Sequence, residues 1–116
     1  WYPATVLTGV TPKFEIANQE IFGPVAAVQR VSSDDEALKI ANDTVFGLAG
    51  YVMGEDMKKT LRFAERMEAG MVGVNRGALS DASAPFGGVK QSGLGREGGF
   101  EGIEEYLETV YLALDV

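Results

Sequence analysis

Short apolar stretches recur along the chain and predict four strands. The segment Thr5–Leu7 predicts a brief first strand, which a turn follows. The nearly continuous apolar run Val25–Val31 is typical of a strand that is covered on both faces. Two further runs, Leu48–Met53 and Met71–Val74, predict the remaining strands.

Two helices are predicted between these strands. Ser33 and Glu36 have the spacing of a capping box, in which the Ser33 hydroxyl accepts from the Glu36 amide and the Glu36 carboxylate reaches back. The helix that they begin should end near Asp43. Asp56 is placed to cap the second helix and Gly70 to stop it. The second helix carries its apolar residues on one face: Met57, Leu61, Ala64 and Met67.

The order strand, helix, strand, helix, strand predicts an α/β fold. Short connections of this kind are typical of two βαβ crossovers on one parallel sheet, within a single compact unit. Ligands of such sheets gather at the carboxyl ends of the strands, which directs attention to the aperiodic, glycine-rich loop Asn75–Gly99. A short helix is expected around Phe100–Tyr106. The β-prone run Thr109–Leu114 then needs a partner strand, within the fold or on another chain.

Charge and missing residue types narrow the chemistry. Ten Lys and Arg against 17 Asp and Glu give a net charge of −7, which argues against nucleic acid and against an anionic membrane as partners. The 116 residues hold no cysteine and no histidine, so they contain no thiolate nucleophile, no imidazole base and no Cys or His metal ligand. We find no bilayer-spanning run or secretory leader in this stretch and expect a cytoplasmic protein. The start at Trp1, directly before an apolar segment, suggests a piece of a longer protein.

Two segments resemble the C-terminal portion of the NAD(P)-dependent aldehyde dehydrogenases. The first, Gln19–Val25, reads QEIFGPV, and the second, Pro85–Gly98, reads PFGGVKQSGLGREG. Each is specific, and they occur in the family's order with the predicted crossovers between them. Further similarity at Tyr2–Leu7 and Gly102–Tyr106 extends the resemblance over essentially the whole chain.

The resemblance implies a nicotinamide cofactor, NAD or NADP. In the family, the residue at the position of Glu20 hydrogen-bonds the nicotinamide ribose, and the residue at the position of Phe22 packs beside the nicotinamide. An ionised carboxylate can accept from both hydroxyls of a ribose diol, and an aromatic ring limits where the nicotinamide sits. On spacing alone, Glu20 would be a solvated loop residue and Phe22 a core residue, but the second motif favours the binding roles.

The resemblance also implies substrate contacts in the second half of the chain. Phe86 matches the aromatic residue that lines the aldehyde tunnel, and Ser80 lies where succinate-semialdehyde dehydrogenases bind the distal carboxylate. Without the motif, Phe86 would be a core residue and Ser80 a turn residue. Arg76 is a weaker candidate for pairing with a carboxylate. Lys90 and Arg96 are expected to hold loop and carbonyl contacts, because the glycine loop lacks the preceding strand and the spacing of a phosphate-binding fingerprint.

A complete member of the family has parts that these residues lack. The family uses a cysteine nucleophile, an oxyanion-binding Asn, a second Glu and a Rossmann-type domain for the adenine half of the cofactor. The resemblance therefore implies residues 1–106 as the C-terminal part of the catalytic domain and residues 107–116 as an oligomerisation strand. The fragment would be inactive alone, in a parent that oxidises an aldehyde such as succinate semialdehyde to its acid.

Two interpretations remain open at this stage. In the first, the chain is part of such an oxidoreductase, and Thr109–Leu114 pairs with a neighbouring subunit of a homo-oligomer. In the second, it is a non-enzymatic α/β interaction module that pairs through the same strand. The sequence does not distinguish NAD from NADP, since the residues that choose between them lie upstream in the family, and it leaves the aldehyde open.

Overall fold

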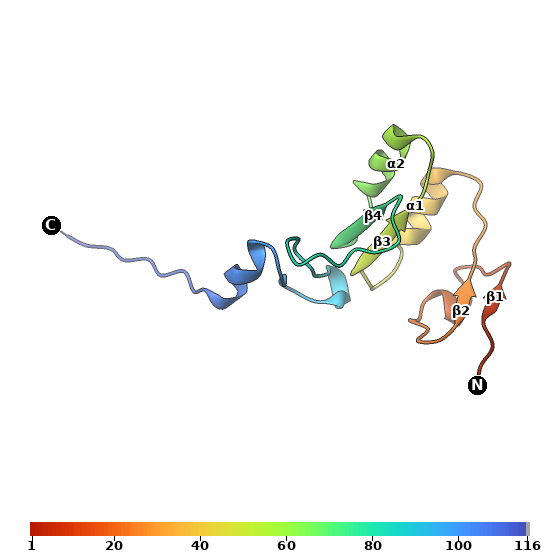
Figure 1. Ribbon diagram of the computed structural model, residues 1–116, viewed down its shortest axis with the longest axis horizontal. Coiled ribbons are helices and arrows are strands. Elements are labelled where there is room, and N and C mark those ends of the chain that lie inside the picture. Colours follow the sequence, from red (N-terminus) through yellow and green to blue (C-terminus); the bar gives the residue numbers. More distant parts are fainter. Residues whose placement is uncertain (116) are drawn as a thin grey trace. The chain divides into compact units, whose positions relative to one another are not determined.

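The four predicted strands form, but they pair into two separate sheets. In the computed structural model, which describes residues 1–115, β1 (Thr5–Leu7) pairs in parallel with β2 (Val25–Ala27). β3 (Ala49–Val52) pairs in parallel with β4 (Met71–Val74) (Figure 1). The prediction of one sheet with two crossovers is therefore wrong for the first crossover, because the ladder of β2 is formed with β1 and not with β3.

The chain also divides into two compact units where one was predicted. The first spans residues 1–44 and contains β1, β2 and α1 (Asp34–Asn42), and the second begins at Val45 and contains β3 and β4. Each of the two strand pairs lies within one unit.

The first unit is built around the β1–β2 pair. The Thr5 amide donates to the Pro24 carbonyl and the Val28 amide donates to the Leu7 carbonyl, each at 2.8 Å, and these bonds frame the ladder. A short 3₁₀ helix, η1 (Glu15–Ala17), lies in the connection. The strand predicted over Val25–Val31 ends at Ala27, and its last two residues are exposed, so the expectation of cover on both faces is wrong within this unit.

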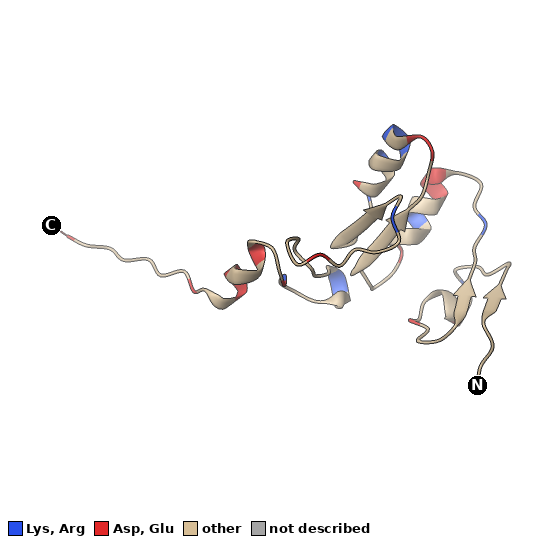
Figure 2. Ribbon diagram, viewed as in Figure 1, with Lys and Arg blue, Asp and Glu red and all other residues tan. Residues whose placement is uncertain are grey.

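Helix α1 begins with the predicted cap. The Ser33 hydroxyl accepts from the Glu36 amide at 3.2 Å, and Asp34, Asp35 and Glu36 fill the first turn, where the helix dipole favours negative charge (Figure 2). The Glu36 carboxylate reaches back one residue further than a capping box requires and accepts from the amide and hydroxyl of Ser32. The helix ends at Asn42, next to the predicted boundary.

The second unit contains the predicted β3–helix–β4 crossover. Asp56 caps α2 (Met57–Ala64) by accepting from the Lys59 amide at 3.1 Å, and α2 packs on both strands. The helix stops at Ala64, three residues earlier than the apolar spacing predicts. Met67 still packs on the sheet from the turn that follows, since a Cβ on Gly50 would lie 2.5 Å from the Met67 methyl group.

The predicted loop after β4 is mostly irregular, with one short 3₁₀ helix, η2 (Lys90–Ser92). The Ser92 hydroxyl accepts from the Gly47 amide at 2.9 Å, and the Val89 amide donates to the Gly47 carbonyl at 2.9 Å, so the loop returns to the start of β3. The predicted last helix forms as η3, a 3₁₀ helix over Glu101–Tyr106. Its charged residues, Glu101, Glu104 and Glu105, are all acidic (Figure 2).

The segment after η3 forms no strand within the described residues. The predicted run Thr109–Leu114 has neither helix nor strand, and its apolar side chains are exposed, with Tyr111 at 87%. Few side chains in residues 1–115 are buried; the buried hydrophobic ones are Val10 and Leu38. No helix in the described part of the chain is both long and apolar enough to cross a membrane.

Candidate functional site

The two cofactor candidates lie in the loop that enters β2. Glu20 is exposed, and Phe22 is 95% exposed on the same short segment. The loop is held tightly after them, because the Gly23 amide donates to the Ile21 carbonyl at 3.0 Å and the Val25 amide donates to the Gly23 carbonyl at 2.8 Å. Within residues 1–115, Glu20 has no hydrogen bond or ion pair, so both carboxylate oxygens can accept from a ligand.

The two substrate candidates line one hollow in the second unit. Ser80 and Phe86 border a space of about 230 Å³ together with Asp81, Glu97 and Gly98. Both come from the loop after β4, so the structure brings together two residues that are six positions apart in the sequence. Glu20 and Phe22 belong to the other unit and make no part of this hollow.

A turn centred on Asp81 shapes the rim of this hollow. Asp81 accepts from the amide of Ser83 at 2.9 Å and from its hydroxyl at 2.7 Å. Both bonds lower the pKa of the Asp81 carboxyl, and the bond from the Ser83 hydroxyl has the larger effect. The positive charge of Arg76 lowers this pKa further. The Arg76 Nε donates to the Ala78 carbonyl at 2.6 Å, and this hydrogen bond ties the Arg76 side chain to the backbone of the loop.

Phe86 is fixed through its backbone rather than by burial. Phe86 and Glu97 form an antiparallel bridge in which each amide donates to the other's carbonyl at 2.7 Å, and the Phe86 side chain is 38% exposed. The two sequence motifs do not identify Glu97 as the partner of Phe86. The feature of the sequence that could have indicated this pairing is the high density of glycines on either side of the bridge, since glycines permit two chain segments to approach closely.

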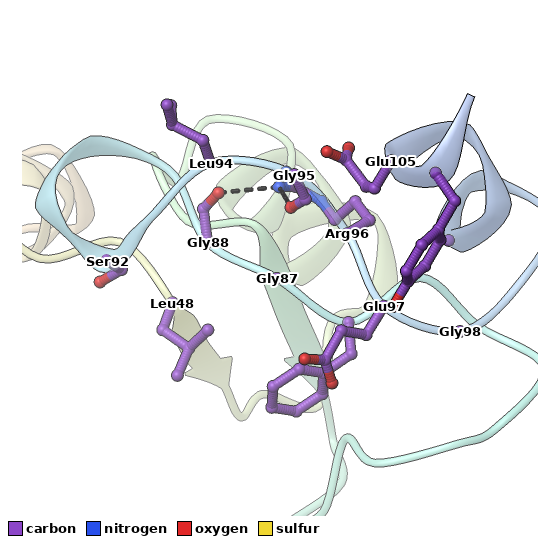
Figure 3. Close-up of a pocket in the computed structure, with 13 residues that line it drawn as sticks. Leu48, Gly87, Gly88, Ser92, Leu94, Gly95, Arg96, Glu97, Gly98 and Glu105 are labelled. Atoms are coloured by element: carbon purple, nitrogen blue, oxygen red, sulfur yellow. Dashed lines mark hydrogen bonds between the residues drawn. The ribbon is translucent and has the colours of Figure 1, made fainter. Parts of the chain in front are cut away.

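A larger hollow of about 730 Å³ lies beside this bridge. Leu48, Gly88 and Ser92 border it, as do Arg96 and Glu105 (Figure 3). Arg96 donates to the carbonyls of Gly88 and Gly95, which are the carbonyl contacts that the sequence predicts. Lys90 forms an ion pair with Glu68 at 2.7 Å. In the part of the chain that the structure describes, no group of three or more Asp and Glu side chains could hold a metal ion.

Comparison with known proteins defines the class to which this fold and these motifs belong. Residues 1–112 match the aldehyde dehydrogenase family, so the chain belongs to the aldehyde dehydrogenase family. The predicted resemblance is therefore confirmed. The match covers both motifs and the segment after η3 as far as Leu112.

Two relatives and one solved structure give the likeness in detail. A 3-sulfolactaldehyde dehydrogenase of Pseudomonas putida and a succinate-semialdehyde dehydrogenase of Paenarthrobacter nicotinovorans are each 53% identical over 114 residues, which is 98% of this chain. A betaine aldehyde dehydrogenase of Staphylococcus aureus, crystallised in complex with NAD⁺, superposes with a TM-score of 0.84 at 44% identity over 87% of this chain and 20% of that one. The chain covers 24% and 25% of the two curated relatives, about a quarter of their length.

The exposed pair Glu20 and Phe22 fits a nicotinamide cofactor on its own chemistry. A carboxylate with two open oxygens suits the paired hydroxyls of a ribose, and an uncovered aromatic ring suits a flat heterocycle. A nicotinamide cofactor in its oxidised form accepts a hydride.

Proposed function

We propose that this chain contributes cofactor and substrate contacts to an enzyme that oxidises an aldehyde to its carboxylic acid with NAD⁺ or NADP⁺. The aldehyde would carry an anionic group at its far end, and succinate semialdehyde is the first candidate. The observation that carries the proposal is the family match over residues 1–112, which includes both motifs. Because these residues contain no cysteine, the nucleophile would come from a part of the enzyme outside this sequence.

The substrate class is supported by the names of similar proteins and by the hollow beside Phe86. Succinate semialdehyde and 3-sulfolactaldehyde both carry an anion, a carboxylate or a sulfonate, and the two relatives are named for them. The Ser80 hydroxyl would donate a hydrogen bond to that anion, while Phe86 would flank the carbon chain of the aldehyde. Asp81 and Glu97 border the same hollow, so their negative charges oppose an anion there, and the hydrogen bond from Ser80 would have to offset that repulsion.

The cofactor role is assigned to Glu20 and Phe22. Glu20 would accept from the two ribose hydroxyls, and Phe22 would form one wall of the nicotinamide site. Their exposure supports this role, since neither side chain is engaged by the described part of the protein. The adenine half of the cofactor would be bound by residues that this sequence does not contain.

The remaining parts of the proposal concern assembly and location. Residues 1–106 would form the end of the catalytic domain, and residues 107–116 would add a strand to a neighbouring subunit of a cytoplasmic homo-oligomer. The exposed apolar side chains of Thr109–Leu114 support the need for a partner strand.

A substrate panel tests the proposed activity on the complete enzyme. We expect turnover with NAD⁺ or NADP⁺ and a kcat/KM for succinate semialdehyde well above that for butanal, its neutral four-carbon counterpart. Ser80→Ala should lower kcat/KM for succinate semialdehyde about tenfold and leave butanal nearly unchanged, because one hydrogen bond to a charged group is worth about 1.5–3 kcal/mol. Absence of aldehyde oxidation with either cofactor would refute the activity, and equal losses for both substrates would refute the role of Ser80.

The mass of the native gene product separates this function from that of a free-standing interaction module. An antibody raised against these residues should detect a polypeptide several-fold heavier than 12.4 kDa. A product of about this mass would contain no nucleophile for the reaction, and the module that pairs through Thr109–Leu114 would then be the better interpretation.

A further inference from the structure

The segment that carries Phe86 is held against the segment that carries Glu97. The two backbone hydrogen bonds between these residues set the direction in which the Phe86 side chain leaves the loop. Only one such bridge joins the two segments within the described residues. A two-residue bridge is weak by itself, since an isolated pair of strands is marginal in water.

Arg96 adds a second connection between the same segments. Its Nη1 donates to the Gly88 carbonyl at 2.8 Å and to the Gly95 carbonyl at 2.7 Å, and both bonds are partly buried (Figure 3). Gly88 lies two residues after Phe86, and Arg96 directly precedes Glu97. A single charged nitrogen therefore ties together both chain segments on the side of the bridge away from Pro85.

The glycines between these residues permit the two segments to approach closely. A Cβ on Gly87 would lie 2.5 Å from the Gly95 carbonyl oxygen and 2.8 Å from Cδ of Arg96. Gly95 has a φ of +77°, a conformation that favours glycine, and a Cβ added there would lie 2.7 Å from the Glu105 carboxylate of η3. The aliphatic part of Arg96 thus packs on Gly87 while its charged end bonds the flanking carbonyls.

We propose that Arg96 is a positioning residue that fixes the Phe86 side chain at the aldehyde site by clamping the Gly88 and Gly95 carbonyls. This inference rests on the proposed function, which assigns Phe86 to the substrate tunnel. Phe86 lines both hollows, whereas Arg96 borders only the larger one and is not among the residues around the smaller hollow that contains Ser80. In this proposal, Arg96 acts on the substrate through the loop that carries Phe86.

The test uses the complete enzyme with Arg96→Met, which keeps much of the aliphatic packing and removes both donors. Arg96→Lys is the conservative variant, because both bonds leave from one nitrogen and an ammonium group can donate to two carbonyls. Arg62→Met is the matched control, since Arg62 lies exposed on α2 and its bond to the Lys58 carbonyl is long at 3.4 Å. Kinetics are normalised to the concentration of titrated active sites, so that loss of folded enzyme does not enter the result.

We expect Arg96→Met to raise the KM for the aldehyde about tenfold and to leave the KM for the cofactor within twofold. The ratio of kcat/KM between butanal and the bulkier benzaldehyde should fall, because a loosened Phe86 discriminates less by size. Arg96→Lys should recover most of both effects, and Arg62→Met should show neither. A parallel change in both KM values and kcat, or a Lys variant that folds but behaves like the Met variant, would overturn the proposal.

Hydrogen exchange provides a readout that does not depend on turnover. The amides of Phe86 and Glu97 should exchange at least tenfold faster in Arg96→Met than in the unmodified enzyme, while the β3–β4 amides keep their protection. If the unmodified enzyme oxidises no aldehyde, the proposed function fails. Independently of turnover, an unchanged exchange rate of the Phe86 amide in Arg96→Met would refute the clamp. If turnover is present and exchange accelerates without a change in aldehyde KM, the proposed function stands and the positioning role is overturned.

Discussion

The side-chain amide of Asn75 completes the end of the β3–β4 pair by bonding the backbone of Gly54. Its Nδ2 donates to the Gly54 carbonyl and its Oδ1 accepts from the Gly54 amide, both at 2.8 Å. Asn75 follows β4 directly, and its own amide donates to the Val52 carbonyl at 2.9 Å. Its φ of +52° is a left-handed conformation that Asn tolerates better than most residues. One residue thus ends the strand, extends its ladder and starts the loop that leads to Ser80.

Replacing Asn75 by Gly and by Ala separates its hydrogen bonds from its backbone conformation. Asn75→Gly loses both side-chain bonds without backbone strain, and we expect a loss of about 1 kcal/mol in the free energy of unfolding. Asn75→Ala loses the same bonds and must also adopt a positive φ, so its loss should be about 2 kcal/mol. Urea denaturation of the two variants measures the difference. Equal stability of the Gly variant and the unmodified protein would show that the bonds to Gly54 contribute nothing.

Gly87→Ala should destabilise the loop that carries Phe86. The added methyl group would lie 2.5 Å from the Gly95 carbonyl oxygen, which belongs to the backbone and cannot simply rotate away. Overpacking of this kind costs about 1–3 kcal/mol. Gly77→Ala is the control, because a Cβ at Gly77 meets nothing within 4 Å and its φ is not left-handed. Thermal unfolding should show a lower Tm for the first variant only, and equal Tm values would contradict the close approach.

Local signals in the sequence predict the elements of this fold well. Ser33 and Asp56 accept from the amides that their spacing indicates, and the run Met71–Val74 forms a strand with the predicted bounds. These features depend on a few neighbouring residues. The pairing of β2 with β1 could not be predicted in the same way, because hydrophobic periodicity indicates a strand but not the edge on which it pairs.

The candidate site was predictable as a set of residues but not as an arrangement. The two motifs indicate Glu20, Phe22 and Phe86, and Ser80 follows from its position six residues before Phe86. The bridge between Phe86 and Glu97 requires the ten residues between them, mostly irregular chain with the short helix η2, to fold back, and no hydrophobic periodicity indicates this. The roles of the four candidates stay predictions until the complete enzyme is tested.

The pKa of Glu36 links the cap of α1 to acid stability. The Ser32 hydroxyl and the Ser32 amide both donate to this carboxylate and lower its pKa from the ordinary value, and the hydroxyl bond has the larger effect. A carboxyl group whose pKa is lower in the folded state stabilises the protein fully at a pH above its unfolded-state pKa. That stabilisation is lost as the pH falls through the folded-state pKa. Ser32→Ala removes the hydroxyl bond and should raise the pKa of Glu36 toward the ordinary value in an NMR titration of its side-chain carboxyl. No change between the two proteins would contradict the assigned cause.

Glu20→Gln in the complete enzyme tests the most specific part of the cofactor assignment. The substitution keeps the size of the side chain and removes the charge that would strengthen two hydrogen bonds to the ribose hydroxyls. Loss of a charge-assisted hydrogen bond is worth about 1.5–3 kcal/mol, so the KM for the cofactor should rise at least tenfold or hydride transfer should slow by a similar factor. The KM for the aldehyde should change little.

Glu55→Gln is the matched control for Glu20→Gln. Glu55 is an exposed carboxylate in the turn before α2, so its replacement removes the same charge from the protein without touching the proposed ribose contact. If both variants weaken cofactor binding equally, the effect reflects net charge and Glu20 has no specific role. If Glu20→Gln alone impairs the cofactor steps, and salt affects both variants alike, a direct contact between the Glu20 carboxylate and the ribose is the simplest physical cause.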